Sequence, residues 1–197
     1  MSTTGRKKKD LSGEYLGILY ESDEEKHFLF WVELLMLSGH ILRVERGNTF
    51  SLTEGLVNEY SIEMPRKGTI IKRQQLLRPS VYTPDYKIYW NPKRHRKFVW
   101  TLDYDSKCDK LIGHTDVDGN LYTLIECKSD FDRNNMTRLF ISNQKFTWTM
   151  HDQYVNLCKI PELFAKTFTP PKYLYTSTGK PRKINFEVRT LKQYLTS

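Results

Sequence analysis

The stretch LYTLIECKSD, residues 121–130, constrains this chain more than any other. Its apolar run predicts a buried strand, yet the strand ends in Glu126 and Lys128, two positions apart. Side chains at positions i and i+2 of a strand lie on the same face, so this acid and this base lie side by side. Charged side chains are seldom buried unless they are paired or bind a metal. The stretch therefore predicts either a structural ion pair or a functional site.

The charge of the chain favours a polyanionic partner. The 197 residues carry a formal net charge of +8, and they are enough for one domain with a substantial core. A basic globular domain most often meets nucleic acid, and the alternative is a generically basic soluble protein. The three cysteines show no C-x-x-C spacing, which argues against a Cys-rich zinc site and fits a reducing compartment.

The N-terminal residues indicate where the protein works. Residues 1–13 include GRKKK and predict a flexible basic arm that touches phosphates or serves as a nuclear address. No apolar segment follows to make a signal peptide, and no window has the roughly 18 apolar residues of a membrane span. We expect no membrane association, and a location in the cytoplasm of a bacterial host, or in the nucleus of a eukaryotic one.

The pattern of apolar residues predicts a mixed α/β domain. Ser22 and Glu25 form a capping box that opens a helix over 22–39, and Gly39 ends it. Residues 134–150 fit a helix or a strand, and of the two a helix is expected. Strands are expected over the following ranges: 40–52, with a turn at Gly47-Asn48, and then 68–77, 80–90 with a break at Pro84, 97–105, 121–128 and 172–177.

Two further acids are candidates to join Glu126 and Lys128. Asp85 follows Pro84 at a strand margin, and it meets Glu126 if the strands 80–90 and 121–128 are neighbours. Glu25 lies on the core side of the first helix. Each has a plainer reading: an exposed Glu126–Lys128 pair, a turn residue at Asp85, and a simple capping role for Glu25.

Two close carboxylates repel each other unless a proton or a cation shares the site. Carboxylates with water ligands suit Mg²⁺, and Mn²⁺ is the alternative. A lysine beside them can orient a water or stabilise charge developing on a phosphate.

The combination of Pro84-Asp85, Glu126-Cys127-Lys128 and an upstream helical Glu25 resembles the PD-(D/E)xK nuclease superfamily. The stretches SDEEKHFLFWVELLMLSGHI and YTPDY are similar to those of small phage-borne endonucleases and of transposase endonuclease subunits. The resemblance covers about residues 20–130, in three short blocks.

The resemblance implies a restriction-endonuclease-like fold, a mixed sheet flanked by helices, that hydrolyses phosphodiester bonds with Mg²⁺. It makes Glu25, Asp85, Glu126 and Lys128 catalytic. Asp85, Glu126 and the Cys127 carbonyl would bind the metal, with Glu25 binding directly or through water. Lys128 would position the attacking water, and the Cys127 side chain would point into the core.

The chain departs from the family in its long gap between Asp85 and Glu126. An insertion over 91–120 within a domain of residues 14–178 would explain the gap, followed by a basic tail over 179–197. The gap also admits other first acids: Asp103, Asp105, Asp109, Asp116 and Asp118. Nucleic-acid contacts are expected from the basic cluster of the insertion and from one later lysine: Lys93, Arg94, His95, Arg96, Lys97 and Lys145.

The expected activity is that of a DNA endonuclease of phage or mobile-element origin, acting on double-stranded or branched DNA. Many nucleases of this kind act as homodimers. Two alternatives stay open: a nucleic-acid-binding protein without catalysis, and a transposase-type subunit that cleaves only with a protein partner.

Overall fold

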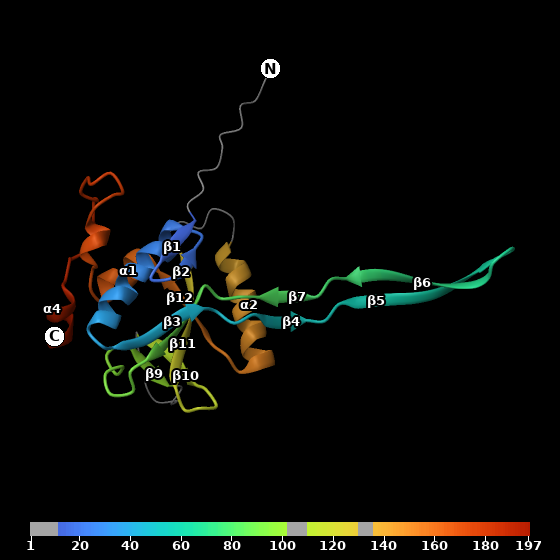
Figure 1. Ribbon diagram of the computed structural model, residues 1–197, viewed down its shortest axis with the longest axis horizontal. Coiled ribbons are helices and arrows are strands. Elements are labelled where there is room, and N and C mark those ends of the chain that lie inside the picture. Colours follow the sequence, from blue (N-terminus) through green and yellow to red (C-terminus); the bar gives the residue numbers. More distant parts are fainter. Residues whose placement is uncertain (1–11, 102–109, 130–135) are drawn as a thin grey trace, which may run out of the picture.

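A mixed sheet of six strands forms the centre of the fold (Figure 1). The computed structural model describes residues 12–101, 110–129 and 136–197. Five strands follow one another across the sheet: β3 (Ile41–Arg46), β8 (Tyr86–Trp90), β11 (Leu121–Lys128), β10 (Leu111–Thr115) and β9 (Val99–Thr101). The sixth, β12 (Val155–Lys159), pairs in parallel with β11, whereas β8 and β10 pair with β11 antiparallel. The mixed α/β class predicted from the sequence is confirmed.

The helix α1 (Asp23–Leu37) covers one face of this sheet, as predicted. The Ser22 side chain accepts a hydrogen bond from the Glu25 N–H and so caps the helix. The aromatic rings of Phe28 and Trp31 are fully buried, and Phe28 stacks on Tyr86 of β8 with ring centroids 5.6 Å apart. Burial of large aromatic side chains against the sheet therefore fixes the helix, and its capped N-terminus, relative to β8.

The predicted second helix is α2 (Met136–His151), which packs near the opposite face of the sheet. Phe140 and Leu52 join apolar side chains of β8, β11 and β12 in a second, smaller core. The next strand, β12, was not predicted, because its buried VNLCK segment is too short to show a period.

The long arm between β3 and β8 is the least expected feature. A short pair, β4 (Phe50–Thr53) with β7 (Ser80–Tyr82), leads into a ribbon of β5 (Leu56–Met64) and β6 (Gly68–Leu77). Figure 1 shows this ribbon reaching far away from the sheet and its helices. The predicted strands 40–52 and 80–90 are thus each divided between the central sheet and the arm.

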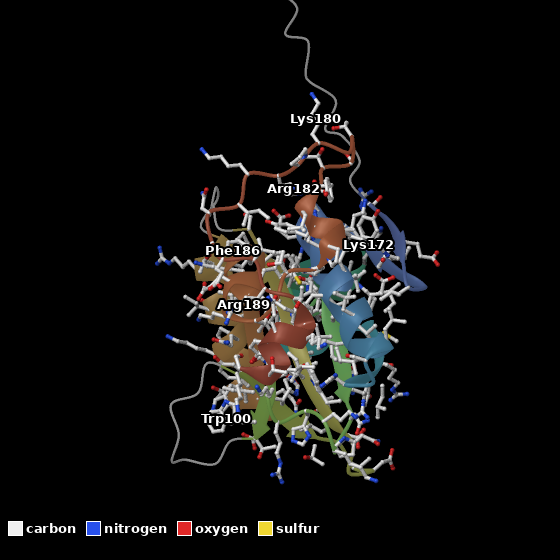
Figure 2. All side chains as sticks on the ribbon, turned by 90° about the vertical axis from the view of Figure 1, so that its left-hand side faces the viewer. Trp100, Lys172, Lys180, Arg182, Phe186 and Arg189 are labelled. Carbon is white, nitrogen blue, oxygen red and sulfur yellow. The ribbon has the colours of Figure 1, made fainter. Side chains whose placement is uncertain are left out.

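The C-terminal segment lies over the α1 side of the molecule (Figure 2). It contains α3 (Ile160–Lys166), the 3₁₀ helix η1 (Pro171–Leu174) and α4 (Leu191–Thr196). The predicted strand at 172–177 is wrong, because Pro171 begins η1 and the Tyr173 ring packs edge-on against His27 and Phe164.

At the other end of the described chain, β1 (Gly13–Tyr15) and β2 (Ile18–Tyr20) form a small hairpin before α1. None of the helices in the described ranges is long and apolar enough to cross a bilayer. Of residues 91–120, the described part supplies β9 and β10 to the central sheet.

Candidate functional site

The strand register brings Asp85 and Glu126 together. The antiparallel pairing of β8 with β11 sets Tyr86 opposite Ile125. Asp85 precedes Tyr86 in the chain and Glu126 follows Ile125, so in an antiparallel pair these two acids are neighbours across the strands. The Cys127 N–H donates a hydrogen bond of 2.7 Å to Asp85 Oδ2, which fixes this carboxylate against the end of β11. The structure thus joins the two acids that the sequence places 41 positions apart.

Glu126 and Lys128 form the ion pair that their spacing allows. Lys128 Nζ lies 2.6 Å from Glu126 Oε1, and the side chains are only 23% and 9% exposed. The hydroxyl of Tyr82 donates a second hydrogen bond, of 2.8 Å, to Glu126 Oε2. Both oxygens of the Glu126 carboxylate are therefore held. The alternative prediction of an exposed Glu126–Lys128 pair is wrong, because both side chains are largely covered.

Glu25 lies at the start of α1 and is also held. Its Oε1 accepts from the Ser22 hydroxyl, and its Oε2 accepts from the backbone N–H of Glu21. Arg46, the last residue of β3, places Nη1 2.9 Å from the same Oε2. Because Arg46 pairs across strands with Tyr86, this contact belongs to the end of the sheet that carries Asp85.

Burial and charge raise the pKa of Asp85 to about 7. Burial is the largest cause, and the negative charge of Glu126 adds to it. The Cys127 N–H and the Lys128 ammonium lower this pKa, and Glu25 raises it further. Asp85 is thus within electrostatic reach of both other acids, and this end of the sheet favours an added proton or cation.

Two neighbours respond to the same charges. Burial alone would lower the pKa of Lys128, but its ion pair with Glu126 raises the pKa above the ordinary value and keeps the lysine charged. Burial raises the pKa of the Cys127 thiol well above its usual value. Cys127 therefore acts as a small core side chain, as predicted, and is not a thiolate.

A buried polar atom at the site lacks a partner. The Tyr86 hydroxyl is buried and accepts or donates no hydrogen bond within the described part of the chain. Its raised pKa is caused first by burial and then by Cys127, Glu25 and Asp85, so the hydroxyl lies among these groups. An unsatisfied buried hydroxyl is rare and invites a ligand or a water.

The donor set suits a hard divalent cation. Asp85 and Glu126 supply carboxylate oxygens, Glu25 is nearby, and the charges of both glutamates raise the pKa of Asp85. In the side-chain positions described for residues 12–101, 110–129 and 136–197, no three His, Cys, Asp or Glu side chains are already grouped around one point. Glu25 and Glu126 are instead turned toward Arg46 and Lys128.

The structure does not bring the predicted basic cluster to this site. Residues 93–97 follow the far end of β8, where Arg94 Nη1 donates to the Ser38 carbonyl at the C-terminus of α1. Lys97 and Tyr194 of α4 exchange hydrogen bonds there. The acids lie at the opposite ends of β8 and α1. Lys145 is exposed on α2, away from the acid pair's contacts.

The two alternative first acids within the described residues, Asp116 and Asp118, are not at the site. Asp116 accepts hydrogen bonds from Asn120 and from the Asp118 N–H in the turn before β11, at the other end of that strand from Glu126. Asp103, Asp105 and Asp109 lie outside the described residues.

Sequence reasoning missed three residues of the site: Arg46, Tyr82 and Tyr86. Tyr82 and Tyr86 lie within three positions of Asp85 in YTPDY, so their closeness in the chain was the signal that could have found them. Arg46 left no such pattern, because its role depends on the pairing of β3 with β8 across the whole arm.

Comparisons of the chain with protein-family models, with curated proteins and with solved structures found no match.

Proposed function

We propose that this protein is a Mg²⁺-dependent DNA endonuclease with a restriction-endonuclease-like core. The observation that supports it is the pairing of Asp85 with Glu126 at one edge of the sheet, with Lys128 2.6 Å from Glu126. A buried acid, a half-buried acid and a lysine at a strand end are the parts that metal-assisted phosphodiester hydrolysis needs. The same parts produce the resemblance to the PD-(D/E)xK superfamily.

Each side chain has a separate role in this proposal. Asp85 and Glu126 present carboxylate oxygens, and the Cys127 N–H and the Tyr82 hydroxyl keep those oxygens in place. Lys128 orients the attacking water and carries positive charge toward the phosphate. Its raised pKa keeps it protonated, so it does not serve as a general base at neutral pH.

Asp85, Glu126 and the Cys127 carbonyl would hold Mg²⁺, or Mn²⁺, with Glu25 as a direct or water-mediated ligand. The bound ion would stabilise negative charge on the phosphate and lower the pKa of its water. Release of Glu25 from Arg46 would leave this arginine free to contact a phosphate oxygen.

The net charge of +8 supports DNA as the substrate class. The cluster at 93–97 lies far from the acids, so it would hold DNA, if at all, at a distance from the cleaved bond. The positive groups beside the acids are Arg46 and Lys128.

Plasmid cleavage by the purified protein tests the proposal. We expect nicking with Mg²⁺ and none with EDTA. Asp85→Asn and Glu126→Gln should each reduce the rate at least about 100-fold while DNA binding persists. The control is Glu162→Gln, which removes a carboxylate from the exposed Glu162–Lys166 pair on α3 and should leave cleavage unchanged. Equal cleavage by the wild type and both site variants would refute the assignment.

The existing ion pairs favour a second reading. Glu25 with Arg46, and Glu126 with Lys128, already neutralise two of the three acids. A DNA-binding protein without catalysis, or a transposase-type subunit that a protein partner activates, would keep such pairs closed. Wild-type protein that binds DNA but cuts neither plasmid nor branched DNA would favour these readings, and cleavage restored by a partner would select the subunit.

A further inference from the structure

The arm begins and ends at the candidate site. Arg46 ends β3 and Asp85 precedes β8, so residues 47–84 form the arm between these two site residues. The Gly47 N–H donates a 3.3 Å hydrogen bond to the Asp85 carbonyl and closes the base of the arm. Figure 1 shows the arm extending away from the sheet and its helices. A duplex that lies across the acids is therefore within reach of the arm.

The β5–β6 ribbon has two chemically different faces. Residues opposite each other in the register share a face, and the faces alternate along each strand. Both acids of the two strands, Glu59 and Glu63, lie on one face, which we call the back face. The other face has no acid, and we call it the reading face. Its members are Asn58, Tyr60, Ile62, Met64, Gly68, Ile70, Lys72 and Gln74.

The hydrogen-bond donors of the two faces differ in the same way. On the back face, Arg73 forms an ion pair of 2.6 Å with Glu59, and Gln75 Nε2 donates to the Leu77 carbonyl. Three exposed side chains of the reading face make no hydrogen bond or ion pair with any residue that the structure describes: Asn58, Lys72 and Gln74. The back face thus satisfies its own donors, whereas the donors of the reading face are open to a ligand.

The tip of the ribbon adds two cations. Arg66 and Lys67 lie in the turn between β5 and β6, where the Lys67 N–H donates to the Met64 carbonyl. Both side chains are exposed, and neither forms an ion pair within the described part of the chain. Together with Lys72, the tip and the reading face carry three positive charges and no negative one. This charge suits a polyanion.

We propose that the reading face enters the major groove of the DNA that the acids hold, about one helical turn from the bond to be cleaved. The major groove is about 12 Å wide and admits a two-stranded β-ribbon. Asn58 lies twelve residues beyond Arg46 in the chain. Twelve extended residues span at most ~40 Å, and one turn of DNA spans ~35 Å. The inference rests on the proposed function for the choice of DNA, and it adds where and how the DNA is read.

The reading face carries side chains of the types that recognise base edges. Asn and Gln bind N6 and N7 of adenine, Lys binds O6 and N7 of guanine, and apolar side chains contact the thymine methyl group. Asn58 faces Gln74 across the ribbon, and Lys72 belongs to the next pair on the same face. Ile62 and Ile70 form the pair after that. The two cations at the tip contact phosphates and fix the position of the ribbon along the groove.

The apolar side chains of the ribbon do not select a protein as the occupant of one face. Exposed apolar side chains lie on both faces: Tyr60 and Met64 on the reading face, and Val57 and Ile71 on the back face. Apolar contact alone would therefore not distinguish the faces. The open donors and the absence of acids do distinguish the reading face, and both match the negative potential of DNA.

Selection of duplexes from a pool with about 20 random base pairs, or two helical turns, tests base reading. The full-length protein is used with EDTA, so that no duplex is cut. We expect the wild type to enrich a motif, and Gln74→Ala to lose a preference of about 10-fold at one base pair of it. The matched control is Gln75→Ala, since Gln75 is the neighbouring residue on the back face. It should enrich the wild-type motif.

Fluorescence anisotropy on the enriched duplex tests the charges. Lys72→Gln should raise the dissociation constant about 5- to 10-fold at about 0.1 M salt. Arg73→Gln removes the same charge from the back face and should change the dissociation constant less than about 2-fold. Replacing Arg66 and Lys67 together by Gln should lower the slope of log K against log salt by about 2. Similar circular dichroism and melting of all variants would show that folding is unchanged.

Three outcomes would overturn the proposal. The first is a wild type that enriches no motif. The second is an equal loss of affinity in Lys72→Gln and Arg73→Gln, which would mean that overall charge binds DNA and the reading face does not. The third is unchanged DNA binding in Lys72→Gln, together with self-association of the wild type that Met64→Glu abolishes. This last result would identify a second copy as the occupant.

Failure of the arm and failure of the acid site are distinguishable. Asp85→Asn should keep the enriched motif and the affinity in EDTA although its cleavage is lost. A wild type that enriches a motif but cuts no DNA would refute the endonuclease and still support the arm. A wild type that cuts DNA without base preference would refute the arm alone.

Discussion

At the scale of single residues, the site places three acidic side chains close together where they are partly removed from water, which disfavours their charged forms. Asp85 bears the consequence, because Glu126 is opposite it and Glu25 is near it. Protein interiors tolerate such clusters only when other groups compensate them. The strain is a reason to regard this edge of the sheet as functional.

Asp85→Asn should stabilise the protein in the absence of metal at alkaline pH. The folded-state pKa of Asp85 is about 7 and the unfolded value 3.8, so the folded state holds an extra proton between these values. Stability therefore falls as pH rises from about 4 to 7, and the full loss is present above pH 7. We expect the variant to be more stable than wild type at pH 8 by on the order of 1 kcal/mol and similar to it at pH 4.

Mg²⁺ provides the complementary measurement on the same variant. Millimolar Mg²⁺ should raise the melting temperature of the wild type, because a ligand that binds only the folded state stabilises it. Asp85→Asn should respond much less. The same Mg²⁺ shift in both proteins would show that Asp85 does not bind the ion.

Tyr82 is expected to position Glu126. Tyr82→Phe removes the 2.8 Å hydrogen bond to Glu126 Oε2 and should cost about 1–2 kcal/mol of unfolding free energy. Because the hydroxyl would act through Glu126, the change should also lower kcat with little change in KM. Urea unfolding and steady-state cleavage measure the two effects. Tyr89→Phe, another buried tyrosine of the same small core, is the control and should change neither.

At the scale of elements, the contact between α1 and the C-terminal segment contains an acid-sensitive group. His27 Nε2 lies 3.0 Å from Arg182 Nη2, and the His27 ring packs edge-on against Tyr173. Burial and then the Arg182 charge lower the pKa of His27 to about 4, against the smaller opposing effect of Asp23. Lys26 also lowers this pKa. Protonation would place two cations together at this contact.

Acid should therefore loosen the C-terminal segment. The unfolded pKa of 6.5 exceeds the folded value, so the contribution of His27 is complete above pH 6.5 and is lost as pH falls toward 4. Between pH 7.5 and 5, wild type should lose about 1 kcal/mol more stability than His27→Gln, after allowance for partial exposure. Arg182→Gln should reduce the loss. Urea unfolding at both pH values measures it, and parallel loss in wild type and His27→Gln would contradict this role.

The elements with a clear period were predictable from the sequence. Ser22, the spacing of Phe28 and Val32, and Gly39 predicted α1. Asp85 and Glu126 were expected to meet only if their two strands were neighbours, and β8 does pair with β11. Short buried segments such as β12 have no period to read. The C-terminal segment KYLYTS has the composition of a strand. It instead begins in the 3₁₀ helix η1, which starts at Pro171 and packs Tyr173 against the core.

At the scale of the whole molecule, the location of the charges could not be predicted. The basic cluster at 93–97 was predicted to contact nucleic acid, but its distance from the acids could not be read from the sequence. Asp85 precedes β8 and the cluster follows it, so the length of the strand lies between them. The cluster instead contacts Ser38 and Tyr194. Only the topology tells which charged groups share an end of the sheet.

The arm also has a consequence for how the chain folds. Arg46 and Tyr86 are partners in the β3–β8 register, although residues 47–85 separate them. Closing a loop of that length costs about 2 kcal/mol more entropy than closing a four-residue turn. The β5–β6 hairpin can zip from Gly68 in microseconds, and each pair it forms shortens the open chain between Arg46 and Tyr86. The arm would then act as a nucleus that draws β3 and β8 together, and with them the Arg46 and Asp85 ends of the site.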